Sequence, residues 1–361
     1  MNLSQINKKL ITIVAVVAAL FVVAFIVISI INRDRILELS TIEKRMEAGA
    51  KKYLEDNPEL LPKENSEQAV ISVTTLEDGE YIPMMSKMVK EDTVCNGEVR
   101  VTNNGGHYVY FSYLNCGKEH VTTELYKKIT NSSNIVTEDD GLYEMNGEYV
   151  FRGEKVNNFV EFAGQKWQVI KVDNDNHIKI LQYDTKTKQV WDNRYNIDRN
   201  GTTGINEYPK SYVENFLLET FDKSELIDEK LKGLVVYKSF CIGKRNMDET
   251  NKSGKVECSK LSEPAPLGLI QVSDYMNASL DKNCKETLSR SCQNYNYLAE
   301  NSSSWWTLTP VAENTHRVYK FTSGYLSSSS LTTSARVRAV LHLSDNVVYN
   351  GGTGTFEEPY I

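Results

Sequence analysis

The sequence predicts an α+β protein: an N-terminal transmembrane helix that continues into an amphipathic helix with a small antiparallel sheet, then a β-rich α+β domain. Three observations support this. Residues 10–31 form a long uncharged apolar run, the apolar positions after it recur at three- and four-residue steps, and the remainder holds short apolar segments between turn residues. A chain of 361 residues accommodates an anchor and two domains of roughly 100–200 residues each.

The run Leu10–Ile31 predicts a membrane anchor over residues 10–32, preceded by a cytoplasmic tail at 1–9. At about 1.5 Å per residue, a helix of this length extends ~33 Å and crosses a hydrocarbon core of ~30 Å. The run ends in Ile28-Ser29-Ile30-Ile31, without the small residues of a cleavage site. We therefore expect the anchor to be retained rather than removed as a signal peptide.

The cysteines decide the orientation, since basic residues lie on both sides of the run. All six cysteines follow the run, and no two form a C-x-x-C pair. An even number without metal-ligand spacing favours disulfides in an oxidising compartment. We expect a single-pass protein of the cell membrane with its N-terminus in the cytoplasm and the bulk of the chain outside the cell.

An amphipathic helix is expected to run on to about Glu55, where Asn57-Pro58 ends it. Its apolar stripe can cover a small sheet. A coiled-coil dimer is the alternative interpretation, although the stripe lasts barely two heptads. The stripe consists of Leu39, Ile42, Met46, Ala50 and Tyr53.

A β-hairpin is predicted after the first strand, Ala69–Thr74. Strands Glu98–Thr102 and His107–Leu114 flank Asn103-Asn104-Gly105-Gly106, whose residue types suit a turn with positive φ. Cys95 and Cys116 lie at nearly equal distances from this turn. Because antiparallel pairing places such positions side by side, we expect them to form a disulfide.

The stretches MEAGAKKYLEDNPELLP and DTVCNGEVRVTNNGGHYVYFSYLNC resemble type IV pilin-like and pseudopilin-like surface proteins of Gram-positive bacteria, over about residues 33–120. The resemblance implies a pilin-like domain at 33–130. True prepilins carry a Gly–Phe cleavage junction and an early glutamate in the apolar helix. Here no glycine precedes Gly49, and residues 10–31 contain no acid. We expect a pilin-like stalk kept in the membrane, with self-association through the N-terminal helix as an open alternative.

A polar stretch at 118–141 predicts a boundary, with a linker at 131–141 and the β-rich domain at 142–361. Two helices are expected, over Pro209–Phe221 and from Ser273, a suitable N-cap, to about Leu280. Proximity pairs Cys241 with Cys258 and Cys284 with Cys292, one of three connectivities for four cysteines. The expected strands are Tyr149–Arg152, Asn158–Phe162, Lys166–Val172, His177–Tyr183, Leu234–Tyr237, Leu267–Val272, Trp305–Thr309, Arg317–Phe321 and Val337–Leu343.

The segments PLGLIQVSDY, SWWTLTP and VRAVLHLS resemble, in the same order, a domain of unknown function on secreted and surface proteins of Firmicutes. Its signature is a WWLRSP-like stretch followed by a GVRPVL-like strand. The resemblance covers about residues 142–361 and implies a fold weakly similar to C-type lectins and the formylglycine-generating enzyme group. This chain departs from the signature at Arg336, which replaces the usual glycine, and at Ala339, which replaces the usual proline.

Trp305 and Trp306, with Tyr325, Arg336 and Arg338, are the candidate ligand-binding residues. Adjacent strand residues face opposite sides, so one indole is expected in the core and the other at the surface. An exposed indole beside an arginine would stack on a sugar or a peptide. The alternative is that both indoles fill the core and the arginines satisfy nearby carbonyl groups.

The sequence contains no pattern that indicates catalysis, a cofactor or a metal. Gly351–Thr355 lacks the lysine of a phosphate-binding loop, and the histidines are scattered. Asp173 and Asp175 begin like a calcium loop, but the sixth position is Ile178 instead of glycine, so a hairpin turn is expected. A net charge of −7 gives no attraction for nucleic acid.

These observations predict a non-enzymatic surface protein that displays an adhesin or lectin-like domain to an extracellular glycan or protein ligand. The alternative is a minor-pilin or pseudopilin-like component of a type IV pilus or secretion-type assembly.

Overall fold

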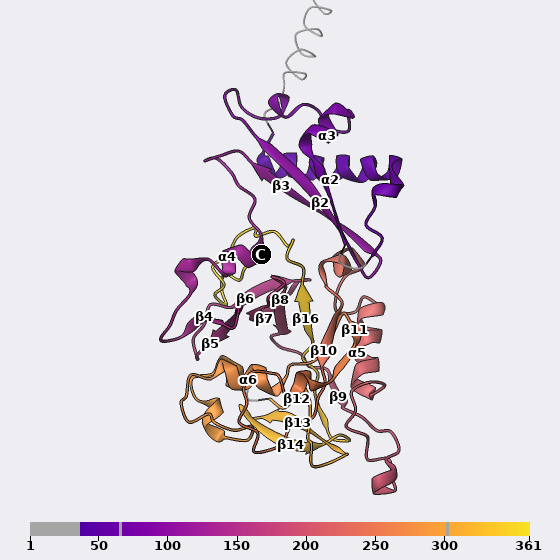
Figure 1. Ribbon diagram of the computed structural model, residues 1–361, viewed down its shortest axis with the longest axis vertical. Coiled ribbons are helices and arrows are strands. Elements are labelled where there is room, and N and C mark those ends of the chain that lie inside the picture. Colours follow the sequence, from indigo (N-terminus) through magenta and orange to yellow (C-terminus); the bar gives the residue numbers. More distant parts are fainter. Residues whose placement is uncertain (1–36, 65–66, 301–302) are drawn as a thin grey trace, which may run out of the picture. The chain divides into compact units, whose positions relative to one another are not determined.

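The computed structural model describes residues 37–64, 67–300 and 303–361 (Figure 1). The predicted tail and membrane anchor lie outside these residues. In the described part of the chain, no helix has the length and apolar character needed to span a bilayer. Two compact units are present: the first takes the described residues up to Pro58 with Ile71–Val99 and Ser112–Val121, and the second takes Glu59–Val70, Arg100–Phe111 and Thr122–Ile361.

Helix α2 (Leu39–Asp56) is the amphipathic helix predicted from the sequence, and Asn57 ends it. Its stripe is buried at Ile42, Met46 and Ala50. The helix also contacts β3 (His107–Asn115) within the first unit, since the Ser112 hydroxyl donates to the Glu43 carbonyl oxygen at 2.7 Å. These three positions are therefore buried inside one chain, and a coiled-coil seam along them would require the first unit to open.

A three-stranded sheet follows, with the order β1-β2-β3, and it contains the predicted hairpin. The strands are β1 (Gln68–Ser72), β2 (Asn96–Asn104) and β3 (His107–Asn115). At the turn, Gly105 and Gly106 have φ values of +62° and +88°, as the sequence predicts. The Cys95–Cys116 disulfide is confirmed.

The first strand ends earlier than predicted because Ser72 caps a helix. Its hydroxyl accepts a hydrogen bond from the Thr75 amide at 3.0 Å, which begins α3 (Val73–Asp78). The last two residues of the expected strand, Val73 and Thr74, therefore belong to this helix.

Two larger sheets form the centre of the second unit. The six-stranded sheet has the order β16-β8-β7-β5-β4, with β6 also paired to β7, and its pairs are antiparallel. Its strands are β4 (Gly141–Met145), β5 (Glu148–Arg152), β6 (Phe159–Phe162), β7 (Gln165–Val172), β8 (Ile178–Gln182) and β16 (Val340–Leu343).

The five-stranded sheet has the order β14-β13-β12-β15-β9, in which β12 and β15 are parallel. A separate two-stranded ribbon joins β10 (Lys238–Cys241) to β11 (Leu261–Ala265). The strands of the five-stranded sheet are β9 (Lys188–Val190), β12 (Trp305–Pro310), β13 (Arg317–Thr322), β14 (Tyr325–Ser330) and β15 (Ser334–Arg336).

Two predicted strands are wrong. Leu234–Tyr237 and Leu267–Val272 contribute only single bridges, from Val235 to Leu343 and from Gly268 to Val340. These residues are apolar because they are buried against β16, and burial alone does not distinguish a strand from an irregular core segment.

Helices α5 (Tyr212–Asp222) and α6 (Val272–Ala278) correspond to the two predicted helices. The predicted cap of α6 is wrong. Gln271 is the N-cap, and its backbone N–H donates to the Asp274 carboxylate at 3.0 Å. Helix α4 (Leu125–Ile129), in the expected polar boundary, packs into the second unit through Leu125 and Ile129.

Short 3-10 turns connect these elements. They are η1 (Pro58–Leu60), η2 (Met85–Lys87), η3 (Ser132–Asn134), η4 (Ile197–Arg199), η5 (Glu229–Leu234), η6 (Glu257–Ser259), η7 (Arg290–Gln293) and η8 (Tyr297–Ala299).

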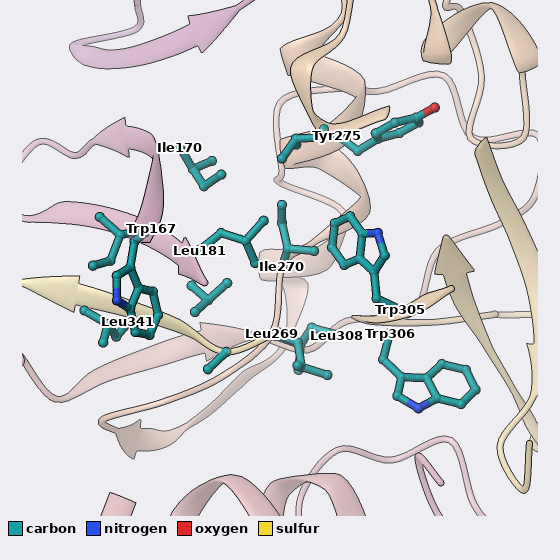
Figure 2. Packing of buried hydrophobic residues seen from close by; sticks show 14 of the residues in the cluster. Trp167, Ile170, Leu181, Leu269, Ile270, Tyr275, Trp305, Trp306, Leu308 and Leu341 are labelled. Carbon is teal, nitrogen blue, oxygen red and sulfur yellow. The ribbon is translucent and has the colours of Figure 1, made fainter. Parts of the chain in front are cut away.

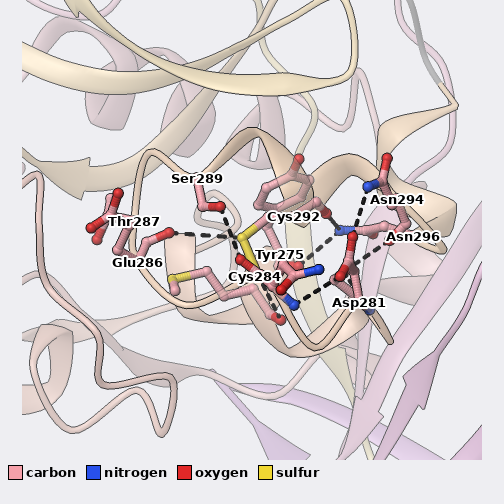
Figure 3. The surroundings of a disulfide bond; sticks show 12 residues. Tyr275, Asp281, Cys284, Glu286, Thr287, Ser289, Cys292, Asn294 and Asn296 are labelled. Atoms are coloured by element: carbon pink, nitrogen blue, oxygen red, sulfur yellow. Dashed lines mark hydrogen bonds between the residues drawn. A yellow bond between two sulfur atoms is a disulfide. The ribbon is translucent and has the colours of Figure 1, made fainter.

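The Cys241–Cys258 and Cys284–Cys292 disulfides are confirmed, so all six cysteines are bonded. Figure 3 shows the surroundings of the second bond, where the Asn296 side-chain amide donates to the carbonyl oxygens of Tyr275 (2.9 Å) and Cys292 (2.7 Å). Three disulfides are typical of proteins that fold in an oxidising compartment. They indicate an extracellular or secreted protein, in agreement with the orientation expected from the sequence.

Candidate ligand-binding site

Both indoles of the Trp305-Trp306 pair are buried, with 0% of each residue exposed. They point to opposite sides of β12, as strand alternation requires, but both sides are covered (Figure 2). Trp305 stacks on Phe321 with ring centroids 3.8 Å apart, and the Trp306 indole N–H donates to the Gln189 carbonyl oxygen at 2.8 Å. Neither ring offers a stacking surface to a ligand, so the pair belongs to the core.

Arg338 lies between β15 and β16, in the link from one sheet to the other, and only 1% of it is exposed. Its guanidinium lies over the Trp305 ring, 4.4 Å from the ring centroid. Two hydrogen bonds hold it, from Nε to the Gln182 carbonyl oxygen (2.7 Å) and from Nη2 to the Gln168 side-chain oxygen (3.1 Å). Burial lowers the pKa of Arg338 to about 9, which leaves the guanidinium charged at neutral pH.

Arg336 and Arg338 meet at one cavity, which we name the arginine cavity. Its volume is about 350 Å³, within the range of ~300–1,000 Å³ typical of small-molecule sites. It opens where β7 and the end of β8 approach β15. The residues that line it are Gln168, Tyr183, Asp184, Tyr297, Glu300, Ser303, Arg336 and Arg338.

Arg336 differs from Arg338 because it has a carboxylate partner. Its Nη1 lies 2.6 Å from the Asp184 carboxylate, and its side chain is 27% exposed. Tyr183 supplies an aromatic side to the cavity. Its ring contacts Phe159 and Phe356 edge-on, with centroids 5.1 and 5.5 Å away, which fixes the orientation of the tyrosine.

Tyr297 and Glu300 complete the site from η8 and its end. Tyr297 is 3% exposed, and its hydroxyl has no hydrogen-bond partner among the described residues. Burial raises the pKa of this hydroxyl, so it remains a protonated donor. Burial and the neighbouring Glu154 raise the pKa of Glu300.

Tyr325 lies outside the arginine cavity. It begins β14, and the guanidinium of Arg290 lies 4.1 Å from its ring centroid. Of the five candidate residues, the structure therefore brings Arg336 and Arg338 together at a cavity, places Trp305 beneath Arg338, and leaves Trp306 and Tyr325 elsewhere.

A second cavity of about 330 Å³, which we name the lysine cavity, is lined by charged residues that neutralise one another. Lys179 is 2% exposed and lies 2.6 Å from the Asp274 carboxylate, and Lys171 lies 2.7 Å from Glu148. Burial lowers the pKa of Lys179 against the opposing effect of Asp274. Burial acts to lower the pKa of Lys171. The carboxylates of Asp274 and Glu148 together outweigh burial and raise this pKa above its usual value.

The expected hairpin turn at Asp173–His177 is confirmed at the edge of the lysine cavity. The Asp173 carboxylate accepts hydrogen bonds from the amides of Asp175 and His177, both at 3.0 Å. These three side chains lie close enough together to share a cation. However, the Lys238 ammonium lies 2.5 Å from Asp173 and 3.0 Å from Asp175 and already supplies the positive charge.

Sequence reasoning missed Gln168, Tyr183 and Tyr297 as parts of the site. They come from β7, the end of β8 and η8, and no motif joins these positions. Their convergence follows from sheet pairing, since β7 and β8 lie beside each other while the chain reaches Arg338 from another sheet.

Comparison with known proteins found no matching family, no similar curated protein and no similar solved structure. The resemblances to pilin-like proteins and to the Firmicutes surface domain therefore stay predictions from the sequence.

Proposed function

We propose that this protein is a membrane-anchored surface protein whose second unit recognises an extracellular glycan, with the arginine cavity as its binding site. The observation that carries the proposal is the convergence of Arg336, Arg338 and the aromatic residue Tyr183 at one cavity of ligand size. Cationic and aromatic groups at one site are the combination that binds polar ligands with apolar faces, such as sugars. The uncharged run at 10–31 and the three disulfides support display outside the cell.

Binding rather than catalysis is the activity that we assign to this cavity. No thiol is available as a nucleophile, because all six cysteines are bonded. The carboxylate of Asp184 is engaged by Arg336, so the described residues that line this cavity include no pair of free acids for general acid–base chemistry.

The experiment uses the full chain in lipid nanodiscs, applied to an array of glycans and cell-wall polymers. Arg336→Gln is the test variant, because Arg336 is partly exposed and its loss leaves the core intact. Arg317→Gln is the matched control. Arg317 is also partly buried on the five-stranded sheet, but it bonds Ser328 and does not line the cavity.

Saturable binding that weakens in Arg336→Gln and persists in Arg317→Gln is the expected result. Binding that is equal in both variants would assign recognition to another surface. An array without any binding would refute glycan recognition and turn attention to assembly through the N-terminal helix.

A further inference from the structure

We propose that the arginine cavity binds an oxyanion, the carboxylate or phosphate group of a charged sugar, with Arg338 as the anchoring residue and Tyr297 as a second donor. This inference rests on the proposed function and names the ligand class for the same site. It starts from two buried polar groups that the described part of the chain leaves incompletely satisfied.

The first group is the guanidinium of Arg338. An arginine has five N–H donors in a planar fork. In the structure, Nε and Nη2 each have one acceptor, and both acceptors are uncharged. Among the described residues, no carboxylate forms an ion pair with Arg338, although only 1% of the residue is exposed. The Asp184 carboxylate at the same cavity opposes the effect of burial on the pKa of Arg338, but it is paired with Arg336 and not with Arg338. A buried charge that lacks an ion pair of its own is unfavourable, so this arrangement suits an anion from outside the chain.

Arg245 is a buried arginine of the same core that has a carboxylate partner, and it serves as a comparison for Arg338. It is 0% exposed, and its guanidinium pairs with the equally buried Glu257 carboxylate at 3.1 Å. Thr287 and the Asn251 carbonyl oxygen accept further hydrogen bonds from it. Arg338 lacks such a partner, and unlike Arg245 it faces a cavity of about 350 Å³.

The second group is the Tyr297 hydroxyl, which lines the same cavity and has no partner among the described residues. A hydroxyl donor and guanidinium donors at one cavity require acceptors from the ligand. Carboxylate and phosphate groups offer several acceptor oxygens and a negative charge, and both bind the arginine fork through two parallel hydrogen bonds.

Two carboxylates also line the cavity and have to be counted against an anion. Asp184 is neutralised by Arg336 at 2.6 Å and accepts a further hydrogen bond from the Thr185 amide at 2.9 Å. Glu300 is partly buried and lies near Glu154, both of which favour its protonated form. Arg336 and Asp184 therefore balance each other, and among the described residues neither Glu300 nor Asp184 forms an ion pair with Arg338.

A sugar, rather than a free inorganic ion, fits the remaining features of the cavity. Its volume exceeds what one small ion needs, and Tyr183 in its lining is an aromatic residue of the kind that packs against sugar rings. Gln168 adds an amide beside Arg338, within reach of hydroxyl groups.

The test uses the full chain in lipid nanodiscs, titrated with glucuronate, glucose 6-phosphate and glucose by calorimetry. We expect at least one charged sugar to bind about tenfold or more tightly than glucose, and the better of the two identifies the anionic group. Arg338→Gln should weaken that binding about 30-fold. Tyr297→Phe, which removes only the unpaired hydroxyl, should weaken it about fivefold.

Tyr208→Phe is the matched control for Tyr297→Phe. Tyr208 is 1% exposed, and its hydroxyl also has no partner in the described part of the chain. It packs against Trp191, with ring centroids 6.2 Å apart, and it does not line the arginine cavity. Its replacement should leave the affinity for the charged sugar unchanged.

The outcomes separate this inference from the proposed function. If glucose binds as tightly as both charged sugars and Arg338→Gln has no effect on a folded protein, the oxyanion is refuted while glycan recognition stands. If Arg338→Gln does not fold, the comparison of Tyr297→Phe with Tyr208→Phe decides. Equal affinities of these two variants for the charged sugar would refute the inference. If none of the three sugars binds, the oxyanion is refuted, and the glycan array then decides the proposed function separately.

Discussion

Acidification is expected to destabilise the second unit through His342. This residue lies in β16, is 8% exposed, and has an Nδ1 atom without a hydrogen-bond partner among the described residues. Burial holds the pKa of His342 well below its usual value, and the positive charges of Lys179, Lys238 and Lys171 add to the effect. Burial also lowers the pKa of the neighbouring His177, with Lys238 acting in the same direction.

The sign follows from linkage between protonation and folding. In the folded protein His342 stays neutral, whereas in the unfolded chain it gains a proton below a pH of about 6.5. The contribution of neutral His342 to the free energy of unfolding is therefore fully present above that pH, and it is lost as the pH falls towards the folded-state pKa. The slope for one group reaches ~1.36 kcal/mol per pH unit only well below the unfolded-state pKa, so at most about 1.6 kcal/mol is lost between pH ~6.5 and ~5.

Urea unfolding followed by tryptophan fluorescence measures this loss. All four tryptophans, Trp167, Trp191, Trp305 and Trp306, belong to the second unit, so the signal reports on that unit. His342→Phe should remove most of the loss between pH ~6.5 and ~5, because phenylalanine has no titrating group and can pack against Phe240, as the imidazole does.

His120→Gln is the control. His120 lies in the first unit, 3.0 Å from Glu43, and its replacement should leave the pH dependence of the tryptophan signal intact. If wild type and His342→Phe lose the same stability on acidification, the assignment to His342 is wrong.

The remaining expectations concern packing, backbone and redox state. Trp306→Ala should cost about 3–5 kcal/mol of unfolding free energy by urea titration, because the indole is fully buried; a change below about 1 kcal/mol would contradict its place in the core. Gly106→Ala should cost about 1 kcal/mol for its positive φ, and Gly105→Ala clearly more in the same assay, because an added Cβ would clash with the ring of Tyr237. Alkylation and mass spectrometry during mild reduction should show Cys241–Cys258 opening before Cys284–Cys292, whose cysteines are both 0% exposed, whereas Cys258 is exposed.

Local features were predictable from the sequence because nearby residues determine them. The hairpin depends on the turn residues around Gly105, and its disulfide joins Cys95 and Cys116, which the two arms bring together. The helix α2 depends on a periodic stripe and a stop at Asn57. In each case the physical cause lies within a few residues or within one hairpin, so a sequence pattern records it.

Features that depend on distant neighbours were not predictable. Leu125 and Ile129 lie in a polar stretch, and only the core of the second unit explains their burial. The arginine cavity depends on sheet pairing that places Gln168 beside Arg338, 170 positions apart in sequence. The pairing of Arg336 with Asp184 likewise spans 152 positions. A single sequence gives no signal for such contacts.

The buried stripe of α2 bears on the alternative of assembly through the N-terminal helix. Ile42, Met46 and Ala50 are each 0% exposed within one chain, so a dimer seam along this stripe would require the first unit to open. Self-association, which stays a prediction, would have to use other residues: the opposite, charged face of α2 or the run at 10–31.

Trp305 and Arg338 are in contact, but they do not form the stacking platform expected from the sequence. Trp305 lies between Phe321, 3.8 Å from its ring centroid, and the Arg338 guanidinium, 4.4 Å away. The Trp305 indole thus attracts the Arg338 guanidinium by a cation–π interaction and orients the guanidinium plane. Two hydrogen bonds to Gln182 and Gln168 fix the guanidinium further, and a charge held in this way loses little side-chain entropy when a ligand binds. Trp305 therefore positions the arginine that we propose meets the ligand, and its own ring is not open to that ligand.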